Sequence, residues 1–82
     1  MLQAKALPIA SIYVPTKRRA TLDVSRVGAI AESILEQGQT TPIMVREDGH
    51  RFVLIEGLHR LEACKSLGEA TIMAFLVQAR RH

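Results

Sequence analysis

The chain has 82 residues, which corresponds to one small domain, so we expect a single folded unit over residues 1–82. Hydrophobic residues make up 48% of it and charged residues 23%, as in ordinary globular proteins, and no apolar run approaches the roughly 18 residues of a membrane span. The net charge of +3 permits contact with phosphates, while a single cysteine and no signal-peptide pattern lead us to expect a cytoplasmic protein without an internal disulfide.

The first predicted elements are a strand and a basic loop. Apolar residues alternate imperfectly over residues 7–14, which predicts a strand with a break near Pro8 and an end at Pro15. Residues 16–21 follow as a predicted loop. Its basic side chains are Lys17, Arg18 and Arg19.

A helix is predicted over residues 24–37, with Asp23 as its N-cap and Gly38 as its C-terminal stop. Gly28 lies inside this helix and costs about 1 kcal/mol relative to alanine, which a close contact between helix and sheet would explain. The apolar stripe of the helix consists of Val27, Ile30, Ala31, Ile34 and Leu35.

Strands follow on both sides of a hairpin turn. The segment from Ile43 to Arg46 is a predicted strand, Asp48-Gly49 is a strong hairpin signal, and residues 51–56 form the returning strand. A final strand over residues 71–77 is apolar on both faces, which is typical of a central strand. The elements add up to about four strands and two helices, an α+β (mixed α/β) fold.

The most informative feature is the change of period at Gly57. Apolar residues run continuously up to this glycine and recur at helical spacing after it, until Gly68. His59 and Arg60 therefore lie in the first turn of a helix, where the dipole disfavours cations and favours an anion. A phosphate shared by the backbone N–H groups and these two side chains would explain their position. The alternative is that Gly57 is only a turn residue and both cations are solvated.

Other chemistry is poorly supported by the residue pattern. No His, Cys or acidic residues have the spacing of a metal site, so we expect no bound structural metal. Cys64 falls on the apolar stripe of the second helix and is interpreted as buried and unreactive. Glu56, at the end of a strand, is the one candidate catalytic base or metal ligand, although a surface glutamate is the commoner case.

The sequence Gly57-Leu58-His59-Arg60 resembles the phosphate-binding box of the ParB/sulfiredoxin superfamily. Partition proteins have Gly-Glu-Arg-Arg there, sulfiredoxins Gly-Cys-His-Arg, and free-serine kinases Asp-Gly-His-His-Arg. The helix that begins after Leu22-Asp23 is similar to the first helix of the family. The segment Pro42-Ile43-Met44-Val45-Arg46 is similar to the family's Pro-Ile-x-Val-Arg strand.

The resemblance implies a ParB/sulfiredoxin-like fold and a nucleotide ligand, CTP or ATP. The residues that it implies for nucleotide or phosphate binding are Gly57, Leu58, His59, Arg60 and Thr41. Those that it implies for contact with nucleotide or DNA are Lys17, Arg18, Arg19 and Thr21. Weak, non-specific DNA binding and a homodimer or a partner protein are further expectations.

Two function classes remain open. The first is a nucleotide-binding module that serves plasmid or chromosome partition or DNA-linked regulation. The second is a small phosphotransferase or nucleotide hydrolase that uses Glu56 and His59. Leu58 occupies the position of the sulfiredoxin catalytic cysteine and of the partition-protein glutamate, so sulfinic-acid reduction is not expected and Mg²⁺ coordination is doubtful.

Overall fold

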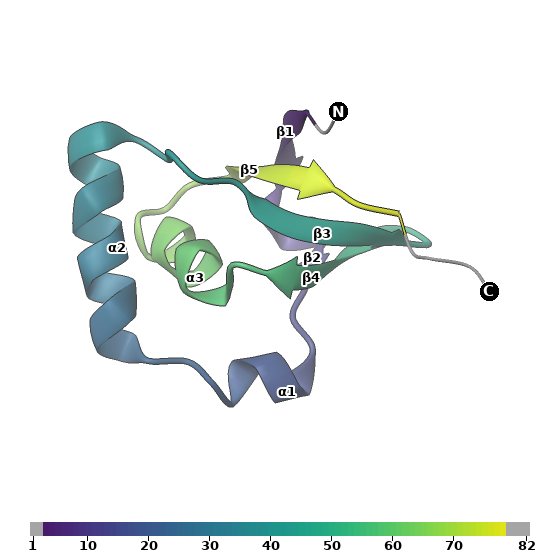
Figure 1. Ribbon diagram of the computed structural model, residues 1–82, viewed down its shortest axis with the longest axis horizontal. Helices are drawn as coiled ribbons and strands as arrows, with labels where there is room; N and C mark the ends of the chain where they lie inside the picture. Colours follow the sequence, from purple (N-terminus) through teal and green to yellow (C-terminus); the bar gives the residue numbers. More distant parts are fainter. Residues whose placement is uncertain (1–2, 79–82) are drawn as a thin grey trace.

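In the computed structural model, which describes residues 3–78, the strands form one mixed sheet in the order β1-β5-β3-β4-β2 (Figure 1). The strands are β1 (Ala4–Pro8), β2 (Ile12–Tyr13), β3 (Ile43–Asp48), β4 (Arg51–Glu56) and β5 (Thr71–Leu76). The helices are a 3₁₀ turn (Ile9–Ser11), α1 (Thr16–Arg19), α2 (Val24–Gln37) and α3 (Leu58–Ser66). The predicted α+β class is confirmed, with five strands in place of about four.

α3 and α2 are stacked outward from the sheet. α3 packs against β3, and α2 packs against α3, so α3 is the middle layer of the molecule (Figure 1). β3 is antiparallel to β4 and parallel to β5. β5 lies between β1 and β3, which confirms the central position predicted from its two apolar faces. Within residues 3–78, no helix is long and apolar enough to cross a membrane.

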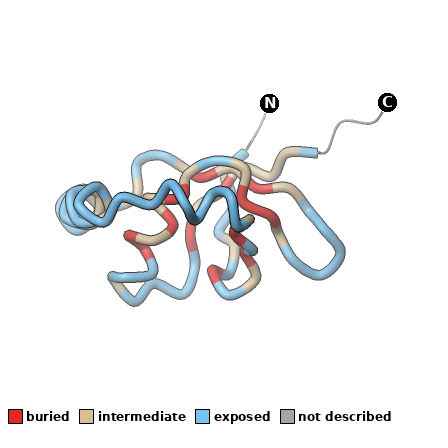
Figure 2. Tube along the Cα trace, turned by 90° about the horizontal axis from the view of Figure 1, so that it is seen from below, coloured by how far each residue is buried: buried red, intermediate tan, exposed pale blue. Residues whose placement is uncertain are grey.

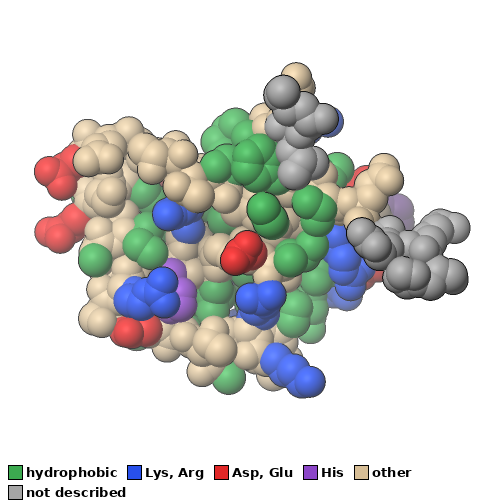
Figure 3. All heavy atoms as spheres, viewed as in Figure 1, with side chains coloured by type: hydrophobic (Ala, Val, Ile, Leu, Met, Phe, Trp, Pro, Cys, Tyr) green, Lys and Arg blue, Asp and Glu red, His purple; other side chains and the backbone are tan. Residues whose placement is uncertain are grey.

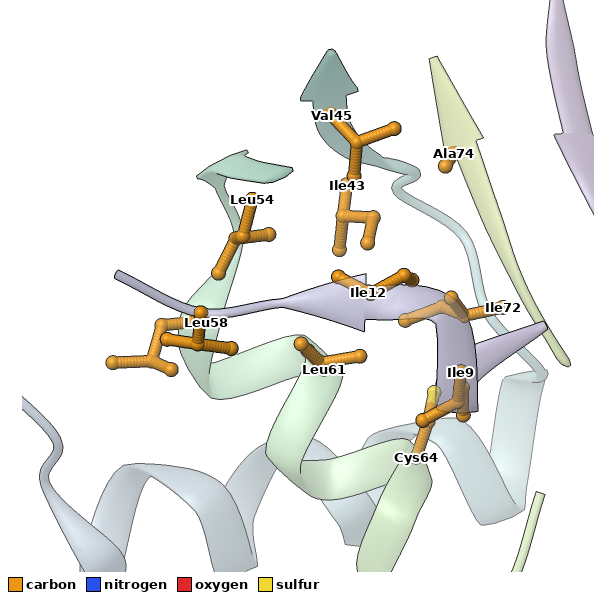
Figure 4. Packing of buried hydrophobic residues seen from close by; sticks show 11 residues of the cluster. Ile9, Ile12, Ile43, Val45, Leu54, Leu58, Leu61, Cys64, Ile72 and Ala74 are labelled. Carbon is orange, nitrogen blue, oxygen red and sulfur yellow. The ribbon is translucent and has the colours of Figure 1, made fainter. Parts of the chain in front are cut away.

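The hydrophobic core lies between the sheet and α3 (Figure 4). The strands contribute Ile43, Val45, Leu54, Ile72 and Ala74, α3 contributes Leu58, Leu61 and Cys64, and the N-terminal segment contributes Ile9, Ile12 and Val14. Cys64 is buried, as predicted. Burial raises the pKa of the Cys64 thiol, which keeps it protonated and unreactive.

The break predicted near Pro8 is confirmed, but the parts of residues 7–14 on its two sides are not pieces of one strand. They belong to β1 and β2, which lie at opposite edges of the sheet and are separated by the 3₁₀ turn. Pro8 has no N–H to continue a ladder, and the next residue, Ile9, donates its N–H to the Ala70 carbonyl oxygen at 3.0 Å. The chain therefore leaves β1 at Pro8 and crosses to the other edge, where Ile12 and Tyr13 pair with β4 in parallel.

The basic loop predicted over residues 16–21 is also partly wrong, because its first four residues form α1. Pro15 precedes the helix at a φ of −58°, close to the value that its ring imposes. The Thr21 hydroxyl donates a hydrogen bond of 2.7 Å to the Arg18 carbonyl oxygen and so completes the end of this short helix.

The predicted bounds of α2 are confirmed. The Asp23 carboxylate accepts a hydrogen bond from the Ser25 N–H at 3.0 Å, and Gly38 ends the helix with a φ of 75°. A second hydrogen bond, from the Ser25 hydroxyl, is the main reason that the pKa of Asp23 is lowered. The cap is therefore negatively charged at neutral pH, at the helix end where the dipole favours an anion.

α2 is less buried than its apolar stripe predicts. None of its residues is buried, as Figure 2 shows, and Leu35 is 72% exposed. A Cβ placed on Gly28 would have nothing within 4 Å. The close contact that we expected to explain Gly28 is therefore wrong.

Candidate functional site

A pocket of about 540 Å³ opens where β4 passes into α3, with α1 and α2 on its other sides. In Figure 3, Lys and Arg side chains gather around this region over α1 and the N-terminal end of α2, with one His among them. The sequence-predicted residues that line the pocket are Arg18, Thr21, Thr41, Glu56, Gly57, Leu58, His59 and Arg60. Lys17 and Arg19 are exposed and do not line it, so their contact with a ligand or DNA stays a prediction.

Gly57 makes the sharp turn from β4 into α3. Its φ of 110° lies in the region that L side chains rarely adopt. A Cβ at this position would lie 2.6 Å from the Ile43 Cγ2 atom and 2.9 Å from its Cβ. Only glycine therefore lets the backbone pass so close to β3, and this approach places the first turn of α3 at the pocket.

The N-terminal end of α3 presents backbone donors to the pocket. The first hydrogen bond of this helix joins the Leu61 N–H to the Gly57 carbonyl oxygen at 2.9 Å, and Gly57 provides no capping side chain. The N–H groups of residues 58–60 therefore have no acceptor within the helix. Such an end attracts an anion through its donors and its dipole.

Leu58 lines the pocket but directs its side chain into the core. The side chain is 6% exposed and packs among the core residues that Figure 4 labels. Any contact of Leu58 with an anion would therefore come from its backbone N–H. Burial also explains why an aliphatic residue is suited to this position, since a polar side chain there would lose its hydration.

His59 links the two helices that border the pocket. Its Nε2 atom accepts a hydrogen bond of 3.0 Å from the backbone N–H of Asp23, the N-cap of α2. A backbone N–H can only donate, so Nε2 carries no proton in this arrangement. Nδ1 is the ring nitrogen left to donate to a ligand, and the predicted contact of His59 with a phosphate stays a prediction.

Three arginines from three helices give the pocket a positive character. Arg18 comes from α1, Arg26 from α2 and Arg60 from α3, and Glu56 is the one carboxylate among the lining residues. Arg26 was missed in the sequence analysis. The signal that could have found it is the one used for Arg60, a cation in the first turn of a helix.

The pocket also has an apolar side that the sequence did not reveal. It is formed by Ile30 of α2, Met44 of β3, Phe75 of β5 and Pro42. Met44 and Phe75 are paired residues on neighbouring strands, so their side chains lie on the same face of the sheet. Because the strands pair only in the folded chain, no local pattern joins these residues.

Gln39 holds the Thr41–Pro42 wall of the pocket in place. Its side-chain amide accepts from the Met73 N–H at 2.8 Å and donates to the Met73 carbonyl oxygen at 2.9 Å, so it pairs with β5 as a strand residue would. The same nitrogen donates to the Thr41 carbonyl oxygen at 3.0 Å. Sequence reasoning missed this residue, because a glutamine in a loop carries no distinctive local signal.

Among residues 3–78, no group of three or more His, Cys, Asp or Glu side chains is arranged to hold a metal ion. The pocket therefore offers cationic and backbone donors to a ligand, and little that would attract a free cation.

The fold agrees with what the comparisons with known proteins show. The model of the ParB N-terminal domain matches residues 2–82, so this chain belongs to the ParB N-terminal domain family. Over 62 residues, 76% of the chain, it is 39% identical to a protein of Campylobacter jejuni described as a probable chromosome-partitioning protein ParB. The chain spans 22% of that protein's length.

Solved structures show the same fold. Sulfiredoxin from Arabidopsis thaliana superposes with a TM-score of 0.81 at 30% identity, covering 96% of this chain and 86% of that one. A C-terminally truncated ParB from Caulobacter crescentus, in complex with CTP-γ-S, gives a TM-score of 0.82 at 22% identity, covering 95% of this chain and 46% of that one. A free serine kinase in complex with AMP gives a TM-score of 0.77 at 14% identity, covering 90% of this chain and 30% of that one.

Proposed function

We propose that this domain is a nucleotide-binding module that takes CTP or ATP in the pocket at the N-terminus of α3. The observation that carries the proposal is the presence of three arginines in a pocket that also includes the uncapped helix end at Gly57. The family membership and the CTP-γ-S bound to the Caulobacter protein support it.

The two sides of the pocket suit the two parts of a nucleotide. Phosphate oxygens would accept from the first-turn N–H groups of α3 and from the planar guanidinium of Arg60. The apolar side chains of Met44 and Phe75 offer a surface for the base. An anion would also relieve the mutual repulsion of the arginines, which costs free energy when the pocket is empty.

Replacing Arg60 by alanine should weaken the binding of CTP or ATP at least tenfold, because a charge-assisted hydrogen bond contributes roughly 1.5–3 kcal/mol. Isothermal titration calorimetry with CTP, ATP and inorganic phosphate measures the effect. Lys65→Ala is the matched control, since it removes a positive charge from the last turn of the same helix, where Lys65 pairs with Glu62 at 3.3 Å. We expect the affinity of this control for nucleotide to lie within about threefold of that of the wild type.

Two results would contradict the proposed site. One is equal affinity in the wild type and Arg60→Ala, and the other is no binding by the wild type at millimolar nucleotide. Binding lost equally in Arg60→Ala and Lys65→Ala would point to a general charge effect instead of a site at α3.

A second candidate function is nucleotide hydrolysis or phosphotransfer, which is favoured by the place of Glu56 beside Gly57 in the pocket. Its exposed carboxylate could orient a water molecule or an acceptor hydroxyl. Phosphate release from ATP and CTP decides between the two functions. The binding module predicts no release, whereas release that Glu56→Gln abolishes would assign Glu56 as a catalytic base.

The biological setting that we propose is partition or DNA-linked regulation in the cytoplasm. The relative from Campylobacter jejuni supports a role in partition, and an unpaired, buried cysteine suits a reducing compartment. Weak, non-specific contact with DNA would involve Lys17 and Arg19 on the exposed surface of α1. A homodimer or a partner protein remains part of this proposal.

A further inference from the structure

The N-terminus of α2 is tied to α3 by one long-range hydrogen bond. The Asp23 N–H donates to the His59 Nε2 atom, although the two residues are 36 positions apart in the chain. α2 packs against α3, but none of its residues is buried. A bond at its first turn therefore has more influence on its position than the same bond would have on a well-buried helix.

The face of α2 that begins at this bond forms one wall of the pocket. Arg26 and Ile30 follow Asp23 at intervals of three and four residues, so all three lie on the same side of the helix. Arg26 and Ile30 both line the pocket, as His59 does. Moving the first turn of α2 away from His59 would carry Arg26 and Ile30 away from any ligand.

We propose that His59 is a positioning residue that holds this wall of the pocket closed by accepting the Asp23 N–H, and that its contribution to binding comes from the Nε2 lone pair rather than from a positive charge. The inference rests on the proposed nucleotide site for its effect on affinity. Its effect on α2 is independent of any ligand.

The pocket holds permanent cations besides the imidazole. Arg60 is its neighbour in the first turn of α3, and Arg18 and Arg26 line the same pocket. Of the carboxylates, Glu56 also lines the pocket, and Asp23 is the residue whose N–H the ring accepts. Three permanent cations already supply the positive charge that a phosphate requires. A fourth cation at His59 would lose the bond to α2 and add repulsion.

The bond can be tested directly in the wild-type protein without a ligand. In ¹⁵N-labelled protein, NMR should show a coupling through the hydrogen bond between the Asp23 backbone nitrogen and the His59 Nε2 atom, together with the chemical shift of an unprotonated Nε2. A ring protonated at Nε2 at neutral pH, with no such coupling, would overturn the proposal before any variant is made.

Substitutions then separate the acceptor from the charge. His59→Gln places an amide oxygen near the position of Nε2 without a charge, His59→Asn has the same amide but is too short, and His59→Lys has the charge without an acceptor. Hydrogen exchange of the Asp23 amide should be about tenfold faster in His59→Asn and His59→Lys, as expected for the loss of one hydrogen bond, and should be restored in His59→Gln.

The affinities of the variants for CTP and ATP, measured by calorimetry, should follow the same order. We expect His59→Lys and His59→Asn to bind at least tenfold more weakly than His59→Gln. Tighter binding by His59→Lys than by His59→Gln would overturn the proposal and make His59 a cationic ligand. If the wild type binds no nucleotide, the proposed function fails, while the exchange of the Asp23 amide still decides whether His59 positions α2.

Discussion

Replacing Gly57 by alanine is expected to lower the free energy of unfolding by about 2–4 kcal/mol. Two costs add up, because an L residue is strained at a φ of 110° and because the new Cβ would lie 2.6 Å from the Ile43 Cγ2 atom. Ile43 is 1% exposed and cannot move aside without disturbing the core. Urea unfolding followed by circular dichroism measures the change, since the chain contains no tryptophan for fluorescence.

The matched control is Gly28→Ala, an alanine introduced in the middle of α2 where nothing lies within 4 Å of the new Cβ. This substitution should leave stability unchanged or raise it by up to about 1 kcal/mol, because alanine is the better helix former. The double variant Gly57→Ala/Ile43→Ala should cost less than the sum of the two single variants, since removing Cγ2 relieves part of the clash. A loss below about 0.5 kcal/mol in Gly57→Ala would contradict the close approach of the two backbones.

Replacing Leu61 by alanine should lower the free energy of unfolding by about 2–5 kcal/mol, the usual range for a buried leucine. Leu61 is a residue of α3 that is 0% exposed, and Figure 4 shows it among the side chains of the core. A domain of this kind has only about 5–15 kcal/mol of total stability, so this one change would remove a large share of it. Because α3 carries the candidate site, we expect the pocket to be lost in the same transition in which the core unfolds.

Leu35→Ala is the control for this prediction, since it makes the same substitution on a side chain that is 72% exposed. We expect it to change stability by no more than about 0.5 kcal/mol. Equal losses in Leu61→Ala and Leu35→Ala would mean that α2 is buried against something else in solution. A small loss in Leu61→Ala alone would place α3 outside the core.

The sequence was informative wherever a local signal determines the structure. Asp23 and Gly38 mark the ends of α2 because a capping carboxylate and a left-handed glycine act on the neighbouring backbone. Asp48-Gly49 predicts the turn between β3 and β4, and the change of period at Gly57 predicts the start of α3. The place of Arg60 at the pocket follows from the same local reasoning.

The tertiary structure alone decided which distant segments meet. β1 and β2 are separated by three residues in the chain, yet they lie at opposite edges of the sheet because each pairs with a different partner strand. The bond of His59 to Asp23 and that of Gln39 to Met73 join residues 36 and 34 positions apart. No period or cap encodes such contacts, since they exist only after the sheet has brought the helices together. The sequence therefore determined the turn at Gly57 and its cations, and the fold determined that α1 and α2 close around them to form a pocket.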